Sequence, residues 1–342
     1  MITIYDIAIK AGVSPSTVSK VVNNYSSMPE DTKKKVRKAM SELNYIPNTG
    51  AKALSKGHSY NVGVLAYLRM DVSPFKHPLF TEILDSFQQE MNAKNYDLLF
   101  VSSNVAGQEG SYYENCVSRD VAGALLFGDL NSPEIREVID SEIPSVAFDY
   151  IGDKMSGVSI DNYEKMKELT LHLISLGHRN IVFIHGEDSF VTRERMRGFK
   201  DAFKERNIPF NERFFVQSDY LDNAKVKNLT RDILRRIVPP TAIMFPDDLS
   251  AVEGMKTLKE MGLSIPEDIS ITGFDGTIFS QIVCPTITTI KQDTKAIGRS
   301  LADELIRQME NKNSPKRLIK VEANFIKGES TGPLKNTNDT SK

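Results

Sequence analysis

Four small polar or basic side chains near the N-terminus have the chemistry of a surface that reads nucleic acid. Val18, Val21 and Val22 recur at helical spacing, so a helix over this stretch leaves its other face to hydroxyl and ammonium groups. Such groups donate hydrogen bonds to base edges and to phosphate oxygens. We therefore interpret these side chains as candidate DNA contacts: Ser16, Thr17, Ser19 and Lys20.

Two short helices joined by a tight turn are predicted to position these groups. Thr3 can cap a first helix, and Asp6, three residues later, completes a capping box. Gly12 supplies the positive φ that ends this helix. Ser14 suits the N-cap of a second helix, and Pro15 suits its first position because no N–H is needed there. This pattern is typical of a helix-turn-helix, whose second helix enters the major groove, although a small helical hairpin with solvated faces has the same pattern.

Positive charge is concentrated in the same region. Residues 1–58 contain nine Lys and Arg against four Asp and Glu, a net charge of +5, so the remainder carries −7 of the total of −2. A basic N-terminal unit on an acidic body indicates local phosphate binding. Residues 49–58 predict either a plain linker or a hinge helix that forms only on DNA, because a two-turn helix is not stable alone in water.

Composition argues against several other classes of protein. The two cysteines, Cys116 and Cys284, are far apart in the sequence and predict a reducing, cytoplasmic setting. No apolar run approaches the ~20 residues that span a bilayer, so we expect no membrane association. The five histidines show no metal spacing, and no P-loop, nucleophile elbow or GxGxxG motif is present. We therefore predict no metal, no cofactor and no catalytic residue.

From Asn61 onward, apolar strands alternate with amphipathic helices. Fully apolar strands in such an alternation are typical of a parallel sheet covered on both faces. The alternation restarts after Asp161, and a last strand–helix–strand begins at Thr286. This predicts two doubly wound parallel-sheet subdomains. The expected strands span 61–67, 96–103, 122–127 and 144–148 in the first unit, and 180–186, 214–217, 241–245 and 269–275 in the second.

The chain also carries a series of longer sequence blocks. They begin with IYDIAIKAGVSPSTVSKVVN, PEDTKKKVRKAMSELNYIPN, AKALS and NVGVL, and continue with SIDNYEKMKELTLHLISLGHRNIVFI, RERMRGFKDAF, DDLSAVEGMKTLKEMGLSIPEDISITGFDG and PTITTIKQD. In this order, over nearly the whole chain, they resemble the lactose-repressor/galactose-repressor family of bacterial transcription regulators.

The resemblance implies a fold class and a division of the chain. The fold is a small all-α helix-turn-helix headpiece plus an α/β core of two doubly wound parallel-sheet subdomains, like that of periplasmic binding proteins. The implied bounds are 1–48 for the headpiece, 49–58 for the hinge, 59–330 for the effector-binding and dimerisation core (N-subdomain about 59–161 plus 291–324, C-subdomain about 162–290) and 331–342 for a flexible tail.

Roles in DNA binding follow from the same resemblance. Pro15, Ser16 and Lys20 occupy the positions that choose bases. At the hinge, Lys52 and Ala53 precede Leu54, an apolar wedge for the minor groove. Further side chains are candidates for phosphate contacts, which position the headpiece without specifying sequence. These are Thr3, Tyr5, Ser14, Thr17, Ser19 and Asn23.

An effector site is implied between the two subdomains, at the carboxyl ends of the strands. An Arg and an Asp on opposite sides can each engage two vicinal hydroxyl groups, and an aromatic ring can stack on the apolar face of a sugar ring. The expected effector is therefore a sugar or a sugar phosphate. The residues at the implied positions are Leu79, Phe80, Asp161, Arg195, Tyr220, Asp248 and Asp275.

The function that this reading predicts is sequence-specific regulation of transcription. We expect a repressor of a carbohydrate-utilisation operon that binds palindromic double-stranded operator DNA as a homodimer and responds to a small effector in the cleft between subdomains. Whether the effector releases or promotes DNA binding stays open. One alternative is a regulator corepressed by a phosphorylated carrier protein of sugar transport, and a weaker alternative is an enzyme built on a sugar-binding cleft.

Overall fold

The computed structural model describes residues 2–23, 25–46, 59–67, 74–105, 108–130, 132–150, 152–220 and 222–335. The chain divides into two compact units, Met1–Tyr60 and Asn61–Lys342. The hinge residues Lys52, Ala53 and Leu54 lie outside the described residues, so their predicted roles stay predictions.

The N-terminal unit is a three-helix bundle whose first two helices form the predicted helix-turn-helix. Thr3 donates from its backbone N and its hydroxyl to the Asp6 carboxylate, both at 2.8 Å, and so starts the first helix. Gly12 ends it with φ +66°, and Ser14 caps the second by accepting from the Thr17 backbone N at 3.1 Å. The helices are α1 (Ile4–Ala11), α2 (Pro15–Val22) and α3 (Glu30–Glu42). Their shared core consists of Ile7, Ala8, Val18, Val21, Val36 and Ala39.

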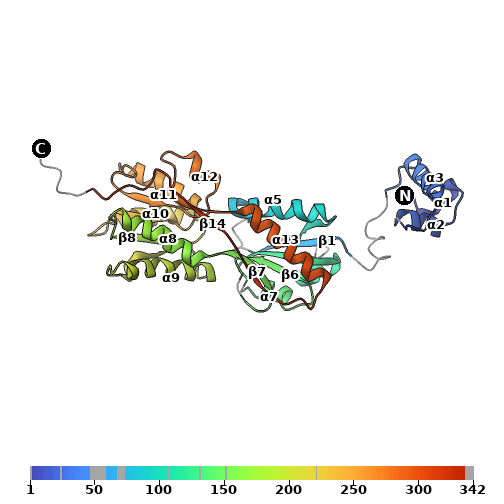
Figure 1. The fold of residues 1–342 in the computed structure, drawn as a ribbon, viewed down its shortest axis with the longest axis horizontal. Coiled ribbons are helices and arrows are strands. Elements are labelled where there is room, and N and C mark those ends of the chain that lie inside the picture. The colour runs from blue at the N-terminus through green and yellow to red at the C-terminus, as the bar shows by residue number, and fades with distance from the viewer. Residues whose placement is uncertain are drawn as a thin grey trace. The chain divides into compact units, whose positions relative to one another are not determined.

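The larger unit contains two parallel sheets, the first with six strands. Its strand order is β13-β7-β6-β5-β1-β2, and every neighbouring pair is parallel. Helices α5 (Pro78–Ala93) and α13 (Thr294–Glu310) lie side by side on it (Figure 1). The strands are β1 (Asn61–Tyr67), β2 (Asp97–Phe100), β5 (Val121–Gly128), β6 (Ser145–Phe148), β7 (Ser156–Ile160) and β13 (Leu318–Val321).

The second sheet has four strands in the order β11-β10-β8-β9, again all parallel. Side chains of β8 alternate between the two faces of this sheet. Val182 and Ile184 pack in a hydrophobic cluster with side chains of α10 and α11, whereas Phe183 lies near Phe199 of α9. The strands are β8 (Ile181–His185), β9 (Phe215–Gln217), β10 (Ala242–Met244) and β11 (Ser270–Thr272). The helices are α8 (Asn162–Ser175), α9 (Phe190–Glu205), α10 (Asn223–Leu234) and α11 (Asp248–Glu260).

The chain passes between the two sheets at three places. It leaves β7 for α8 at Asp161, returns through β12 (Thr289–Gln292) to α13, and leaves β13 through β14 (Ala323–Ile326), which pairs antiparallel with β12. The predicted fold class, an all-α headpiece with an α/β core of two parallel-sheet subdomains, is confirmed. The domain bounds proposed above stay a prediction.

Several short elements differ from the expectation. Strand β7 was not predicted, because its sequence SGVSI lacks a long apolar run, yet all five residues are buried. Helix α6 (Tyr112–Ser118) begins where Ser111 and Glu114 form a capping box. A small hairpin of β3 (Asn104–Val105) and β4 (Gln108–Glu109) precedes it. The remaining elements are η1 (Pro74–Lys76), α7 (Pro133–Ile139), η2 (Glu212–Phe214) and α12 (Ile278–Ile282).

A fully buried carboxylate fastens α13 to the strand that follows it. Glu304, with no exposed surface, accepts from Arg307 and Arg317, each at 2.7 Å, and from Gln308 at 2.9 Å. Burial by itself raises the pKa of Glu304, but hydrogen bonds from Arg307, Ser156, Gln308 and Arg317 outweigh it and lower the pKa to about 2. The ionised form therefore stabilises the packing of β13 onto β7.

We predict that Glu304→Gln lowers the free energy of unfolding by about 3 kcal/mol at pH 7, since the pKa falls from 4.5 to about 2 on folding. A carboxyl group whose pKa is lower in the folded protein stabilises the fold at pH values above its unfolded pKa. This contribution is lost as the pH falls through the folded pKa. The loss should therefore shrink to roughly half at pH 3. Urea denaturation at both pH values measures it, with exposed Glu310→Gln as the control. An equal loss at both pH values would contradict the prediction.

Candidate DNA-binding and effector sites

Hydroxyl groups cluster at the start of α2. Ser14 Oγ lies 2.8 Å from Ser16 Oγ and 2.8 Å from Thr17 Oγ1, and it also accepts from the Thr17 backbone N. Pro15, half-buried, occupies the first turn of this helix. Because Ser14 is engaged as the N-cap, Ser16, which is exposed, is the hydroxyl most available to a base edge.

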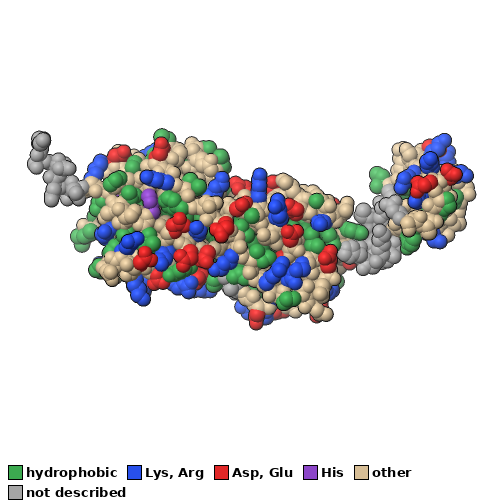
Figure 2. Space-filling view, viewed as in Figure 1, with side chains coloured by type: hydrophobic (Ala, Val, Ile, Leu, Met, Phe, Trp, Pro, Cys, Tyr) green, Lys and Arg blue, Asp and Glu red, His purple; other side chains and the backbone are tan. Residues whose placement is uncertain are grey.

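Lys20 is the basic group that α2 presents to solvent. It is exposed, and among the described residues it forms no ion pair, whereas Lys10 pairs with Glu42 at 3.2 Å and Lys33 with Glu30 at 2.6 Å. Figure 2 shows further Lys and Arg side chains on the visible face of the helical unit. An unpaired lysine at the end of the polar face is free to donate to a base or phosphate.

The other predicted phosphate contacts differ in availability. Tyr5 is 65% exposed. Ser19 is half-buried and accepts from Asn23 Nδ2 at 3.5 Å, while Asn23 Oδ1 is buried without a partner among the described residues. The Thr3 hydroxyl donates its hydrogen to Asp6, so a phosphate contact through this hydroxyl requires that it leave Asp6.

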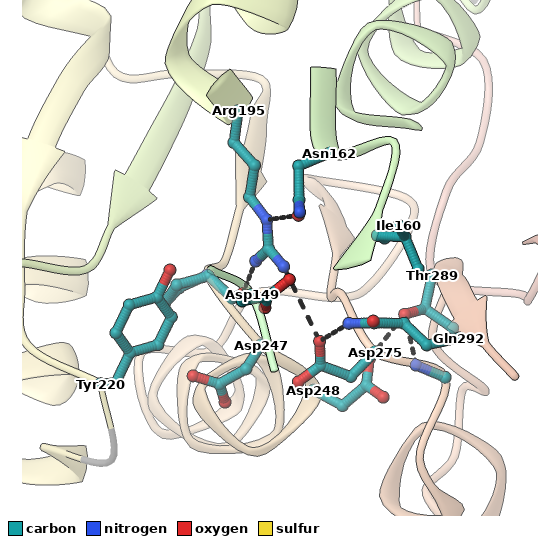
Figure 3. Close-up of polar contacts among 12 residues, drawn as sticks. Asp149, Ile160, Asn162, Arg195, Tyr220, Asp247, Asp248, Asp275, Thr289 and Gln292 are labelled. Atoms are coloured by element: carbon teal, nitrogen blue, oxygen red, sulfur yellow. Dashed lines mark hydrogen bonds and ion pairs between the residues drawn. The ribbon is translucent and has the colours of Figure 1, made fainter. Parts of the chain in front are cut away.

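In the larger unit, polar residues converge where strands of both sheets end (Figure 3). Asp149 follows β6 and Asn162 follows β7, while Asp247 follows β10, Asp275 follows β11 and Gln292 ends β12. In open α/β sheets, ligands bind outside the carboxyl ends of the strands. We refer to these residues, with Arg195 and Asp248, as the polar cluster.

Arg195 of α9 lies at the centre of the polar cluster. Its side chain is 4% exposed. Nε donates to Asn162 Oδ1 at 2.8 Å and one terminal nitrogen donates to the Pro246 carbonyl at 2.9 Å. The other terminal nitrogen lies 4.0 Å from Asp275 Oδ1, and the guanidinium carbon stands 3.6 Å above the centre of the Phe274 ring. The charge is thus compensated in every direction, as burial requires.

A chain of hydrogen bonds runs through this arginine from one sheet to the other. Ser159 of β7 donates to Asp149 at 2.5 Å and accepts from Asn162 Nδ2 at 3.3 Å, and Asn162 in turn accepts from Arg195. On the far side, Gln292 Nε2 donates to Asp275 Oδ1 at 2.8 Å. The polar cluster therefore links side chains of both subdomains.

Two carboxyl groups of the polar cluster, those of Asp149 and Asp275, resist ionisation because their pKa values are raised. Burial raises the pKa of Asp149 to about 6, against opposing effects of the Ser159 hydrogen bond and the charge of Arg195. Burial also raises the pKa of Asp275, while charge on His77 and Arg195 lowers it. Both aspartates have left-handed backbone conformations, with φ of 58° and 102°. Strained, desolvated groups of this kind gather at functional sites.

Aromatic rings adjoin the polar cluster. Phe80 of α5 lies 5.3 Å from Phe127 and 6.1 Å from Phe148, ring centre to ring centre. Tyr220 is packed so closely on Gly186 that a Cβ there would stand 2.1 Å from its ring, and its hydroxyl is 3.4 Å from Thr192 Oγ1. Burial raises the Tyr220 pKa, so the hydroxyl remains a neutral hydrogen-bonding group.

Three of the predicted effector residues have other contacts. Asp161 caps α8 by accepting from the Glu164 backbone N at 3.1 Å, and its other oxygen pairs with Lys320 at 2.6 Å. Asp248 accepts from Thr277 and Thr289, which join the starts of α11 and α12 to β12. Leu79 is buried on α5. Without a ligand, the carboxylates of Asp161 and Asp248 are thus engaged by other residues of the chain, and their predicted effector contacts stay predictions.

Comparisons with known proteins agree with this architecture. Residues 3–48 match the model "Bacterial regulatory proteins, lacI family", and residues 170–331 match "Periplasmic binding protein-like domain". The HTH-type transcriptional repressor PurR of Pectobacterium atrosepticum is 30% identical over 98% of this chain and 99% of its own. The chain belongs to the lacI family of bacterial regulatory proteins. The HTH-type transcriptional regulator DegA of Bacillus subtilis is likewise 30% identical over 97% of this chain and 98% of its own.

Solved structures give the same relation. A lac repressor dimer bound to operator and the anti-inducer ONPF has a TM-score of 0.80 and 25% sequence identity, and covers 97% of this chain and 99% of that one. A CelR–cellobiose complex, at 23% identity and a TM-score of 0.70 over 96% of this chain and 100% of that one, shares the fold. This member of the lacI family is a DNA-binding transcriptional regulator and not an enzyme.

Two searches of the described residues bear on other functions of this lacI-family chain. Within them, no group of three or more His, Cys, Asp and Glu side chains is placed to hold a metal ion. No helix in that part of the chain has the length and apolar character needed to cross a membrane.

Several residues at this site of the lacI-family core were not predicted individually. Asp149 follows an apolar strand at its carboxyl end, and that position alone would have identified it. Asn162 and Gln292 lie within the sequence blocks SIDNYEK and TTIKQD, next to positions that were considered. His77, which influences Asp275, has no recognisable sequence pattern around it, because the two residues meet only through the fold.

We predict that Asp149→Asn stabilises the ligand-free protein at pH 8 by about 1–3 kcal/mol, because the pKa is raised from 3.8 to about 6 on folding. A carboxyl group whose pKa is higher in the folded protein favours folding at pH values below its unfolded pKa. This contribution is lost as the pH rises through the folded pKa. The gain should therefore nearly vanish at pH 4. Denaturant titrations at the two pH values test this, and destabilisation at pH 8 would contradict it.

Proposed function

We propose that this regulator is an effector-controlled repressor that binds a palindromic operator as a homodimer and whose effector occupies the polar cluster. The observation that carries the proposal is the chain of contacts from Asp149 through Arg195 to Gln292, in which hydrogen bonds and the 4.0 Å ion pair between Arg195 and Asp275 link both sheets. A small molecule bound there contacts both subdomains at once. It can therefore favour one arrangement of the subdomains over another.

The proposed effector contacts are the buried polar groups and the adjoining aromatic rings. Arg195 and Asp275 are arranged to engage neighbouring hydroxyl groups, and Phe80 and Tyr220 supply apolar faces. This chemistry favours a sugar-like effector, and a carbohydrate-utilisation operon as the target. Leu79, Asp161 and Asp248 act in this proposal by positioning the backbone around the site.

The proposed DNA contacts divide by type. Pro15, Ser16 and Lys20 face bases, and the hinge wedge is Leu54 with Lys52 and Ala53 beside it. The remaining side chains position the headpiece on phosphates: Thr3, Tyr5, Ser14, Thr17, Ser19 and Asn23. Dimerisation doubles these contacts and accounts for a palindromic site.

Exposed apolar rings on the core support the dimer. Phe75 and Phe100 are 53% and 57% exposed and contact each other edge to face, with ring centres 5.0 Å apart. On the other subdomain, Ile278 and Ile282 of α12 are 53% and 66% exposed. Apolar side chains of this size are typical of surfaces that a second copy covers. Sedimentation equilibrium of the full chain tests the dimer directly.

Lys20→Ala should weaken operator binding by about tenfold to a hundredfold and relax preference at one base position, because a base contact is worth about 1–3 kcal/mol. An operator selected from random duplexes supplies the probe for gel-shift titration. Lys34→Ala, which removes an exposed lysine of α3, is the matched control. The control variant should weaken binding to the specific operator and to random DNA to a similar small extent. Equal behaviour of the two variants would overturn the base-contact assignment.

An effector can be found by titrating operator binding against a panel of sugars, with thermal unfolding as the binding readout. Arg195→Lys should then raise the concentration needed for half response at least tenfold, because lysine lacks the planar fork that contacts Asn162, Pro246 and Asp275. Arg193→Lys on the same helix is the control, since Arg193 is exposed and pairs only with Asp188 at 2.7 Å. An unchanged response in Arg195→Lys would exclude the polar cluster as the effector site.

A further inference from the structure

Helix α3 carries a dense run of positive charge that the contacts assigned to α2 and the hinge do not use. Its residues 33–38 read KKKVRK, five cations without an acid among them. Four of these side chains are exposed to solvent, and we refer to them as the α3 basic face: Lys34, Lys35, Arg37 and Lys38. Since residues 59–342 carry a net charge of −7, this face is a local exception in an acidic protein.

The α3 basic face points away from the core of the N-terminal unit. Lys34 and Lys38 lie two residues on either side of Val36, which has no exposed surface, and so about 160° around the helix from it. On α2, Lys20 stands in the same relation to the buried Val18. Both valines belong to one core, and each of the three helices contacts the other two around it. The outer faces of α2 and α3 therefore point in different directions, and the α3 basic face is a second surface.

This surface has few counter-ions within the protein. At the start of α3, Glu30 is held by Lys33 at 2.6 Å. At the end of the helix, Glu42 is held by Lys10 at 3.2 Å and lies 3.9 Å from Lys38. Among the described residues, the other three members of the α3 basic face form no ion pair.

The like charges of the α3 basic face repel one another. Side chains three or four residues apart on a helix are neighbours, with about 5–6 Å between their Cβ atoms, and like charges at this spacing destabilise the helix. Lys34 has two such neighbours, Arg37 and Lys38. A solvent-exposed helix more often alternates the signs of its charges along one face. A ligand with dense negative charge would relieve the repulsion on α3.

The composition of the α3 basic face favours a nucleic acid backbone over an acidic protein. Protein interfaces are usually built around an apolar centre, whereas the four exposed residues here are all cationic and Ser41, one turn after Arg37, is polar. Duplex DNA presents one negative charge per ~1.7 Å of its axis, and lysine and arginine bind it by displacing counter-ions. DNA is also the ligand that this regulator is known to meet.

We propose that the α3 basic face binds the phosphate backbone of a second DNA segment, without reading its sequence, while α2 holds the operator. One regulator thus holds two DNA segments together. Because the two surfaces point in different directions, the second segment is not the stretch of duplex that α2 occupies. This inference uses the DNA-binding function of the family and does not depend on the proposed effector site.

Energy transfer between two labelled duplexes tests the inference on the full-length protein. A donor-labelled operator, selected from random duplexes and trimmed to its palindrome, is saturated with protein, and an acceptor-labelled duplex without operator sequence is then added. Energy transfer reports a protein that holds both duplexes. Since three phosphate contacts give a salt slope of about −2.7, binding of the second duplex should fall about fortyfold between roughly 50 and 200 mM salt.

A triple variant removes most of the charge from this face. Lys34→Gln, Arg37→Gln and Lys38→Gln together should weaken binding of the second duplex by about tenfold or more and change operator affinity far less. The matched control makes the same change of charge at three exposed core residues and should leave energy transfer unchanged. They form no ion pair among the described residues: Lys204, Arg213 and Lys256.

Three results would overturn the inference. They are the absence of energy transfer with the unaltered protein, equal transfer in the α3 triple variant, and an equal loss of transfer in the control variant. A fall in operator affinity as large as the fall in binding of the second duplex would place α3 on the operator itself, and would count against a second segment in the same way.

Thermal unfolding without DNA gives a second test. Glutamine is a good helix former, and the triple variant removes the repulsion between neighbouring cations, so its midpoint of unfolding should stay the same or rise. A lower midpoint than that of the control variant would show that these cations stabilise the fold. The assignment of the α3 basic face to DNA would then be wrong.

Discussion

The buried guanidinium of Arg195 is the constraint around which the core is arranged. A cation removed from water needs compensation, and here it comes from three separate segments: the start of α8, the end of β10, and the residues Phe274 and Asp275 after β11. Each of these partners lies where a strand ends or a helix begins. Arg195 therefore holds the strand ends of the second subdomain together, and Asn162 continues the link to Ser159 of the first subdomain.

This arrangement explains why strain is tolerated at Asp149 and Asp275. A non-glycine residue at φ 102° is unfavourable by itself, and it persists only where the surroundings determine it. At Asp275 the surroundings are the Gln292 amide and the Arg195 charge, which come from different parts of the chain. With this backbone conformation, the Asp275 carboxylate contacts both the Gln292 amide and the Arg195 guanidinium. The contacts with Gln292 and Arg195 also keep the Asp275 carboxyl group in a buried site, and burial raises its pKa. Buried groups with shifted pKa values are common at ligand-binding sites.

Features that are set by residues close together in the sequence could be predicted from it, whereas features set by contacts between distant residues could not. The helix-turn-helix was predicted residue by residue, because caps, the turn glycine and the valine stripe are local rules, and the structure shows the same bonds at Thr3 and Ser14. Arg195 and Asp275 were found because they lie inside long sequence blocks. The contacts of Asp161 with Lys320 and of Asp248 with Thr289 were not predicted, since only the fold brings these residues together. His77 was missed for the same reason.

The proposed coupling between the polar cluster and DNA binding has a physical basis in the places where the chain crosses between subdomains. Asn162 lies just beyond the first crossing, Gln292 lies in the second, and β14 pairs with β12 at the third. A ligand that changes the partners of Asn162 or Gln292 acts on the crossings themselves, and a small rotation there is carried through whole sheets because packed sheets move as rigid bodies. The first strand of the six-stranded sheet, β1, is the element that follows the hinge in sequence. In the proposed dimer, a rotation of that sheet would move the start of β1 and so change the spacing of the two hinges without a separate signalling element.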